Sequence, residues 1–250
     1  MEKITSTKNQ WVKKVHQLRR AKIRRQEQSY VIEGWHLVKE ALDNQAVFTA
    51  LFVTEEALTL LVEDLPLEPM IVTEEVAKSM SETPAPQGVI AIVKMIQQPD
   101  LFTLQSPILL MDRVQDPGNV GTMIRTADAA GCQAVVLNEG SVDIYNSKVL
   151  RSMQGSQYHL PIYYRRFSEW LPEMKERGWH FYGTELNEAA IDYRSLHPQE
   201  PYGVIMGNEG QGVDKQLLCQ TTQNVYLPMK GRAESLNVAV ATGILLFRWV

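Results

Sequence analysis

The sequence has few of the residues and patterns that mark disulfide-bonded or metal-binding proteins. Cysteine occurs only twice, at Cys132 and Cys219, and no CxxC spacing is present. Neither a disulfide framework nor a zinc site is therefore indicated. The five histidines form no HExxH motif and no i,i+4 pair, so we expect no metal.

Long apolar runs are also absent. The charged N-terminal segment has no apolar stretch of the kind that forms a secretory signal. The most apolar stretch, near Val238 to Val250, contains Thr242, Gly243 and Arg248 and is too short to cross about 30 Å of hydrocarbon. We therefore expect a cytoplasmic protein with no membrane partner. Its 250 residues, 44% of them hydrophobic, suffice for one large or two smaller globular domains.

The net charge of −4 conceals a basic N-terminus. Residues 1 to 25 carry nine Lys and Arg residues and a single Glu. Apolar residues recur among them at near-helical spacing, which predicts an amphipathic basic helix. Such a helix can neutralise the phosphates of RNA, and the candidate contacts are Lys13, Lys14, Arg19 and Arg20. A solvated helix without a nucleic-acid partner is the alternative.

Strands and helices alternate through the first half of the chain. Strands are expected at about residues 29–34, 46–54, 68–73 and 88–95, and helices at 35–43, 55–65 and 73–82. The polar, proline-bounded stretch 98–106 has no apolar period and is interpreted as a linker. We therefore expect one domain over residues 1–97 and a second over 107–250.

The second half repeats this alternation. Strands are expected at about 107–114, 134–138, 159–164, 178–185, 202–207 and 224–228, and helices from 117 and at 147–154, 168–177, 214–219 and 235–248. Strands separated by helices favour an α/β fold with a parallel sheet covered on both faces. The last helix is apolar nearly all round, which predicts that it is buried, either inside the domain, at a subunit interface, or at both.

Three turns with glycine follow strands in this half, at 115–121, 208–212 and 229–237. Ligands of open α/β sheets bind at the carboxyl ends of strands, so the turns predict one pocket. Gly207-Asn-Glu-Gly210-Gln-Gly212 has the dinucleotide spacing reversed, and a G-K-[ST] phosphate loop is missing. A nicotinamide-dependent enzyme is therefore disfavoured.

The residues of these turns form three ordered motifs. They are Asp116-Pro-Gly-Asn119-Val-Gly121-Thr-Met-Ile-Arg125, then Met206-Gly207-Asn208-Glu209-Gly210, then Leu227-Pro228-Met229-Lys-Gly231 running into Ser235-Leu236-Asn237. In this order they resemble the motifs of the SpoU (TrmH-like) RNA 2'-O-ribose methyltransferases, which belong to the SPOUT class. In the first half, Tyr30-Val-Ile-Glu33-Gly34 is similar to the substrate-binding domain of the ribosomal RNA members.

The resemblance implies a fold that periodicity does not reveal. It implies a C-terminal SPOUT domain whose parallel sheet contains a deep trefoil knot, S-adenosylmethionine as methyl donor, no metal, and a homodimer formed through the C-terminal domain. The N-terminal domain would be a small α/β fold like that of certain ribosomal proteins, and it would capture RNA. Topology rules alone favour an unknotted sheet.

The resemblance also assigns roles to individual side chains. It places five residues in the catalytic site: Asn119, Arg125, Glu209, Ser235 and Asn237. It places three around the methyl donor: Gly207, Leu227 and Leu236. Without the motifs, Asn119 and Ser235 would be helix N-caps, Arg125 a solvated arginine, Glu209 a surface carboxylate, and the donor-site residues part of the core. Asn237, inside an apolar helix, is expected to be buried and hydrogen-bonded.

The role of Arg125 has two interpretations. In the family, the corresponding arginine lies beside the ribose and has been proposed to help deprotonate the 2'-hydroxyl. A guanidinium accepts protons poorly, so Arg125 could instead stabilise the developing alkoxide and hold the neighbouring phosphate. Glu209 would orient this arginine and balance its charge.

The sequence thus predicts methylation of a ribose 2'-hydroxyl in structured RNA. Ribosomal RNA is favoured as substrate because the first domain is present. Transfer RNA is the alternative substrate, and a non-catalytic RNA-binding factor on the same fold is the alternative function.

Overall fold

The computed structural model describes residues 2–60, 65–186 and 189–250. Contacts divide the chain into two compact units, one formed by residues 1–97 and 145–158, the other by 98–144 and 159–250. The sequence analysis placed residues 145–158 in the second domain, whereas the contacts of the structure group them with the first unit. In the described part of the chain, no helix combines the length and hydropathy of a transmembrane span.

The first unit contains a five-stranded mixed sheet in the order β1-β4-β3-β5-β2. Its elements are β1 (Lys3–Ile4), α1 (Gln10–Leu18), α2 (Ala21–Glu27), β2 (Ser29–Glu33), α3 (Trp35–Asp43), β3 (Phe48–Thr54), β4 (Met70–Val72), α4 (Glu74–Met80), β5 (Val89–Lys94) and α6 (Ser147–Met153). Strand β5 is antiparallel to both β2 and β3. Alternate residues of β3 and β5, including Phe52 and Ile90, pack with α1 and α4 in one apolar core.

The predicted basic helix is two helices, α1 and α2, joined at Arg19 and Arg20. Arg20 has an extended backbone, with φ −88° and ψ 124°, which interrupts the helix. The buried Arg24 guanidinium donates hydrogen bonds to the carbonyls of Leu18 and Arg19, at 3.0 and 2.7 Å. Arg24 therefore satisfies carbonyls at the end of α1 and is a structural residue.

The helix expected at 55–65 appears in the described residues as a 3-10 turn, Ala57–Leu60. Residues 61–64 of that prediction lie outside the described residues.

Residues 145–158 pack on the first unit through tyrosines. The Tyr30 hydroxyl lies 2.9 Å from that of Tyr158, and the rings of Tyr30 and Tyr145 have centroids 4.5 Å apart. Burial, together with the neighbouring tyrosines, raises the pKa of Tyr30 well above its ordinary value. Tyr30 is therefore a neutral hydrogen-bonding group of the core.

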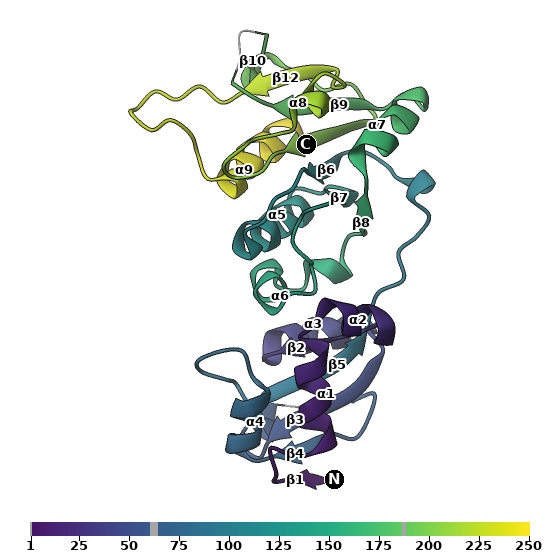
Figure 1. Ribbon diagram of the computed structural model, residues 1–250, viewed down its shortest axis with the longest axis vertical. Coiled ribbons are helices and arrows are strands. Elements are labelled where there is room, and N and C mark those ends of the chain that lie inside the picture. Colours follow the sequence, from purple (N-terminus) through teal and green to yellow (C-terminus); the bar gives the residue numbers. More distant parts are fainter. Residues whose placement is uncertain (1, 61–64, 187–188) are drawn as a thin grey trace. The chain divides into compact units, whose positions relative to one another are not determined.

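The second unit contains a seven-stranded sheet in the order β10-β12-β9-β11-β6-β7-β8. Its elements are β6 (Ile108–Met111), α5 (Pro117–Ala129), β7 (Ala134–Asn138), β8 (Ile162–Arg165), α7 (Phe167–Glu176), β9 (His180–Thr184), β10 (Ile191–Asp192), β11 (Tyr202–Met206), α8 (Lys215–Leu218), β12 (Gln223–Tyr226) and α9 (Val238–Trp249). Every neighbouring pair is parallel, which confirms the predicted α/β fold with a parallel sheet. Helices α5 and α9 pack against each other (Figure 1).

Candidate active site

A cleft of about 860 Å³ lies at the carboxyl ends of β9, β11 and β12. Its walls come from the turn after β11 and from the segment that joins β12 to α9. This is the end of a parallel sheet where ligands bind, and the volume lies within the range of about 300–1,000 Å³ that is usual for small-molecule sites.

The turn after β11 folds tightly because it begins at a glycine. A Cβ atom on Gly207 would lie 2.1 Å from the backbone of both Gly212 and Val213, so only glycine permits this approach. The backbone nitrogens of Asn208 and Gly212 each donate to the other residue's carbonyl, at 3.0 and 2.9 Å. Gly207 therefore shapes the cleft wall through its backbone.

Glu209 joins this turn to the start of α5. Its carboxylate accepts hydrogen bonds from the backbone nitrogens of Gln115 and Asp116, at 3.3 and 3.0 Å, and from Nδ2 of Asn119 at 3.1 Å. Partial burial tends to raise the pKa of Glu209, but the bonds from Asn119 and the backbone outweigh it and hold that pKa below its ordinary value. The carboxylate is ionised at neutral pH, and these contacts weaken only as the pH falls through the lowered pKa.

Asn119 links Glu209 to the last helix. Nδ2 of Asn237 donates to Oδ1 of Asn119 at 2.9 Å, while Asn119 itself donates to Glu209. A chain of side chains thus connects α9, α5 and the turn after β11. Three sequence motifs that are far apart along the chain meet here.

The helix caps differ from those expected. Asp116, not Asn119, caps α5: its Oδ1 accepts from the Asn119 nitrogen at 2.8 Å, and Pro117 follows. Asn237, not Ser235, caps α9 by accepting from the nitrogens of Ala239 and Val240. The expected burial of Asn237 is also wrong, because the residue is exposed. The motif amide of Asn119 is thereby left to bind Glu209.

Arg125 lies on α5 with its side chain exposed. It makes no hydrogen bond or ion pair with the residues described in the structure. The expected contact from Glu209 to Arg125 is therefore not formed, and Glu209 binds Asn119 and the backbone instead. The Arg125 guanidinium is left available to a ligand.

The predicted donor-site residues Leu227 and Leu236 and the predicted catalytic residue Ser235 line the cleft. Leu227 follows β12, and Ser235 and Leu236 precede α9. Leu236 keeps 38% of its surface exposed, so it is not a core residue. Together with Gly207, Glu209 and Asn237, they place six of the eight predicted catalytic and donor-site residues around one space.

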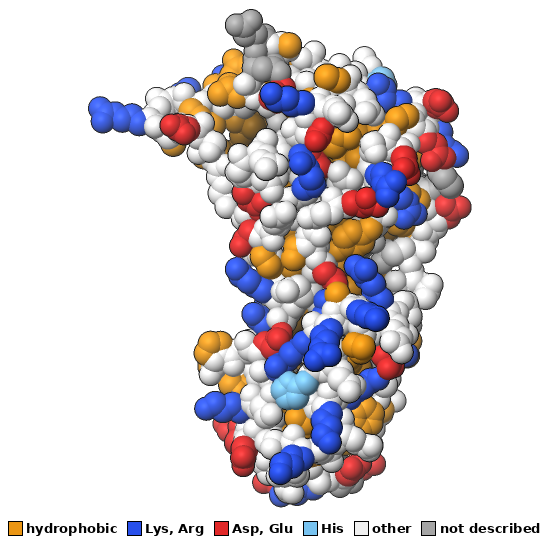
Figure 2. Space-filling view, viewed as in Figure 1, with side chains coloured by type: hydrophobic (Ala, Val, Ile, Leu, Met, Phe, Trp, Pro, Cys, Tyr) orange, Lys and Arg blue, Asp and Glu red, His pale blue; other side chains and the backbone are white. Residues whose placement is uncertain are grey.

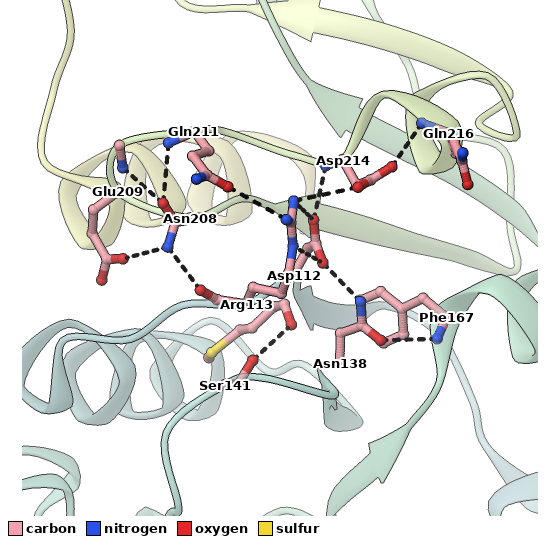
Figure 3. Close-up of polar contacts among 12 residues, drawn as sticks. Asp112, Arg113, Asn138, Ser141, Phe167, Asn208, Glu209, Gln211, Asp214 and Gln216 are labelled. Atoms are coloured by element: carbon pink, nitrogen blue, oxygen red, sulfur yellow. Dashed lines mark hydrogen bonds and ion pairs between the residues drawn. The ribbon is translucent and has the colours of Figure 1, made fainter.

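The sequence analysis missed a polar cluster around the buried Asp112, next to the turn after β11. Asp112 and Arg113 follow β6 directly and contact Asn138, Asn208 and Asp214 (Figure 3). Asp112 is 0% exposed. The only signal was an acidic and a basic residue after an apolar strand, which is equally typical of a surface turn.

The four basic RNA candidates lie in the first unit and differ in their contacts. Lys13 and Arg20 are exposed and have no partner among the described residues. Lys14 pairs with Glu27 at 2.8 Å. Arg19 donates to the carbonyls of Met80 and Ser81 and pairs with Glu82. Figure 2 shows Lys and Arg side chains gathered over α1 and α2.

A metal-binding group is not evident in the described ranges: no three His, Cys, Asp or Glu residues there are placed to hold an ion. The cleft instead offers apolar side chains, backbone groups and the carboxylates of Glu185, Glu209 and Glu234. It is suited to a small organic ligand with polar groups.

Comparison with known proteins identifies related sequences and structures. Residues 106–247 match the SpoU rRNA Methylase family, and residues 9–91 match the MRM3-like substrate binding domain. The chain is 43% identical to the 23S rRNA (guanosine(2553)-2'-O)-methyltransferase RlmP of Bacillus subtilis (strain 168), over 99% of this chain and 98% of that protein.

Solved structures of related proteins superpose on nearly the whole chain. The AdoMet-bound rRNA methyltransferase from Sinorhizobium meliloti superposes with a TM-score of 0.88 at 30% identity, covering 99% of this chain and 96% of that one. An RNA 2'-O ribose methyltransferase superposes with a TM-score of 0.84 at 28% identity, covering 98% and 97%. The chain belongs to the SpoU rRNA methylase family.

Proposed function

We propose that this enzyme transfers a methyl group from S-adenosylmethionine to a ribose 2'-hydroxyl in ribosomal RNA. The observation that carries the proposal is the chain of hydrogen bonds from Asn237 through Asn119 to Glu209, which gathers three family motifs at one edge of the cleft. The similarity to a 23S rRNA 2'-O-methyltransferase over nearly the full length supports the substrate class. A ribosomal RNA substrate also supports a cytoplasmic location.

The cleft fits S-adenosylmethionine in size and chemistry. Leu227 and Leu236 supply apolar surface for a flat heterocycle, and the turn that begins at Gly207 offers backbone groups for polar contacts. When bound, S-adenosylmethionine supplies a methyl group made electrophilic by the positive sulfur, so the reaction needs no metal. The ionised Glu209 and the exposed Ser235 lie in the same cleft and complement a cationic ligand.

Arg125 acts on the RNA in this proposal. Its exposed guanidinium is not committed to a carboxylate among the described residues. Arginine keeps its proton in proteins and donates in pairs to phosphate oxygens. Arg125 therefore orients the ribose through the adjacent phosphate and stabilises negative charge that develops on the 2'-oxygen.

We propose that the C-terminal part of the second unit, from β11 to α9, forms a trefoil knot. Strand β11 lies between β6 and β9, and α9 returns after β12 to pack on α5 and β11. The segment that joins β12 to α9 and the turn after β11 share the cleft. Threading one past the other would give two walls whose relative position is fixed by topology, which suits a preorganised donor site.

The first unit is proposed to be the RNA-capturing domain, resembling small α/β ribosomal proteins, with 98–106 as the linker after it. Its helices α1 and α2 carry Lys13, Lys14, Arg19 and Arg20. Lys13 and Arg20 are the free cations of this set in the described part of the chain. They are the residues available to neutralise phosphates.

Replacing Lys13 and Arg20 together with Gln is expected to weaken RNA binding and leave donor binding unchanged. Each lost phosphate contact should reduce the slope of log affinity against log salt by about 0.7–0.9. Filter binding over a series of salt concentrations measures this slope. The matched control, Lys78→Gln with Lys215→Gln, removes two exposed lysines outside α1 and α2. An equal change in slope for both double variants would show that position on these helices is irrelevant.

We also propose a homodimer formed through the second unit. Helix α9 leaves Val240 53% and Phe247 63% exposed in the single chain. Only Ala239, Thr242, Leu245 and Leu246 of this helix are buried. Apolar side chains that stay exposed on a partly buried helix favour a self-complementary interface.

Val240→Lys with Phe247→Glu is expected to yield monomers with impaired methyl transfer, because charges would be buried in the interface. Light scattering at micromolar concentration measures the mass. Val47→Lys, at an apolar residue of the first unit that is 64% exposed, should leave the dimer intact. A monomeric, fully active wild-type protein would contradict the proposal.

The activity itself is tested with S-adenosylmethionine that carries a labelled methyl group, together with a 23S ribosomal RNA transcript or a transfer RNA pool. Alkaline hydrolysis of RNA uses the 2'-hydroxyl as its internal nucleophile, and a 2'-O-methyl group blocks it. Methylated ribosomal RNA should therefore yield labelled dinucleotides that resist alkali. Label in transfer RNA alone would support the alternative substrate. RNA binding without transfer to either would support a non-catalytic factor.

A further inference from the structure

Two residues directly after β6 hold the loop that forms one wall of the cleft. Asp112 is completely buried, and its carboxylate accepts hydrogen bonds from three different parts of the second unit. Nδ2 of Asn138 donates to Oδ1 at 2.7 Å, and the backbone nitrogen of Asp214 donates to Oδ2 at 2.8 Å. The guanidinium of Arg113 donates to both oxygens, at 3.2 and 3.0 Å.

Asp112 and Arg113 fix both ends of the loop 208–214. The far end is held by the bond from the Asp214 nitrogen to Asp112. The near end is held by Nδ2 of Asn208, which donates to the carbonyl of Arg113 at 2.9 Å. Figure 3 shows these contacts converging from the loop onto the two residues.

The middle of the loop is tied to the same pair. Nη1 of Arg113 lies 3.5 Å from Oε1 of Gln211, and Nη2 lies 3.7 Å from the carboxylate of Asp214. Within the loop, Oδ1 of Asn208 accepts from the nitrogens of Gly210 and Gln211, both at 3.0 Å. The loop is therefore organised around Asn208 and anchored from outside by Asp112 and Arg113.

A buried carboxylate needs this many donors, because an unpaired charge away from water is strongly disfavoured. Removing one donor or one oxygen therefore forces the neighbouring groups to rearrange. The group with most freedom to move is the loop, since Asn138 is fixed in β7 and also accepts from the nitrogen of Phe167 at 3.0 Å.

We infer that Asp112 and Arg113 are positioning residues that set the methyl-donor affinity through the loop 208–214. The inference rests on the proposed function of the cleft. Neither residue lines the cleft, whereas Gly207, Asn208 and Glu209, at the near end of the loop, do. The two residues thus act on the donor through the loop and without contact to it.

Three variants separate this role from general stability. Asp112→Asn keeps the side-chain shape but removes one of the two oxygens that accept hydrogen bonds. Arg113→Gly removes the guanidinium and suits the backbone, because Arg113 has φ 56°, a value that favours glycine. Asn138→Ala is the matched control: it removes a hydrogen bond to the same carboxylate on the side away from the loop.

Donor affinity by calorimetry, the KM for donor and for RNA, and amide hydrogen exchange of residues 208–214 are measured in the full-length protein. Asp112→Asn is expected to raise the donor Kd and KM by at least about tenfold, the cost of one hydrogen bond to a charged group, with RNA KM within twofold of wild type. Arg113→Gly should shift the same quantities in the same direction, and its Tm should fall as well, because the buried Asp112 carboxylate loses its ionic partner. In both variants, exchange should accelerate in the loop.

Asn138→Ala should lower Tm and keep the donor Kd within about twofold, because it leaves both loop anchors in place. Donor Kd and KM unchanged in Arg113→Gly would overturn the inference, and this variant decides the matter if Asp112→Asn does not fold. Equal weakening in Asn138→Ala would also overturn it, by showing that the carboxylate acts through stability alone. Wild-type protein that binds no S-adenosylmethionine would instead overturn the proposed function, and this inference with it.

Discussion

Arg125→Ala is expected to slow methyl transfer by at least about a hundredfold at saturating RNA and donor, the loss typical of removing one group that stabilises a transition state. Arg125 is exposed on α5 and has no partner among the described residues, so its removal should cost the fold little. Donor affinity should stay near that of wild type. Single-turnover transfer to ribosomal RNA measures the chemical step.

Two companion variants sharpen this test. Arg165→Ala removes another exposed arginine of the second unit, one whose guanidinium donates, among the described residues, only to the carbonyl of its neighbour Tyr164. This variant should transfer at the wild-type rate. Arg125→Lys keeps the charge but loses paired donation to a phosphate, so an intermediate rate is expected. An Arg125→Ala enzyme within a few-fold of wild type would show that Arg125 is a solvated helix residue.

Gly207→Ala is expected to reduce donor affinity by about a hundredfold, because the turn must open by an ångström or more, and misplacement on that scale has costs of this order. The added Cβ would lie 2.1 Å from the backbone of Gly212 and Val213, which cannot rotate away as a side chain would. Overpacking of this kind should also destabilise the second unit by at least about 2 kcal/mol. Calorimetry with S-adenosylmethionine and thermal unfolding measure the two effects.

Gly243→Ala is the control for this substitution. Its added Cβ would lie 3.6 Å from the side chain of Thr126, an ordinary van der Waals contact. Because alanine favours the helix interior by about 1 kcal/mol over glycine, Tm should hold or rise. If Gly207→Ala binds S-adenosylmethionine with wild-type affinity, the close approach of Gly207 to the backbone of Gly212 and Val213 does not determine donor binding.

The parallel sheet and its ligand-binding end could be predicted from the sequence, because they depend on the period of the apolar residues and on the order of strands and helices along the chain. Apolar runs separated by helices fix the class of sheet, and turns such as 208–212 after a strand mark the carboxyl edge. The antiparallel placement of β5 could not be read in this way, since pairing direction depends on the tertiary path of the chain.

The helix caps show where sequence interpretation loses accuracy. Moving a helix start by two or three residues exchanges the cap and the next amide, as between Asp116 and Asn119. The shift changes the contacts at the candidate site, because Asp116 takes the cap and the side chain of Asn119 binds Glu209. The motif indicated residues that the structure brings together, while the propensity argument assigned Asn119 the wrong hydrogen bonds.

Buried charged residues leave even less signal in the sequence. Aspartate is a residue type that is common in turns, and only the tertiary structure shows that Asn138 and Asp214 donate hydrogen bonds to Asp112. The same holds for Arg24, which the charge count assigned to an RNA-binding helix and which instead caps α1. Sequence charge therefore overestimates the cations available to a nucleic acid.

The discontinuity of the first unit affects how the protein folds during synthesis. Residues 1–97 leave the ribosome first, yet the unit also includes 145–158. Tyr30 has no hydroxyl partner from Tyr158 and no ring contact with Tyr145 until those residues have been translated. Domains that fold in order from the N-terminus usually finish one before starting the next. Here the strands β6 and β7 and the helix α5 emerge before residues 145–158, so the first unit can be completed only after part of the second has been translated.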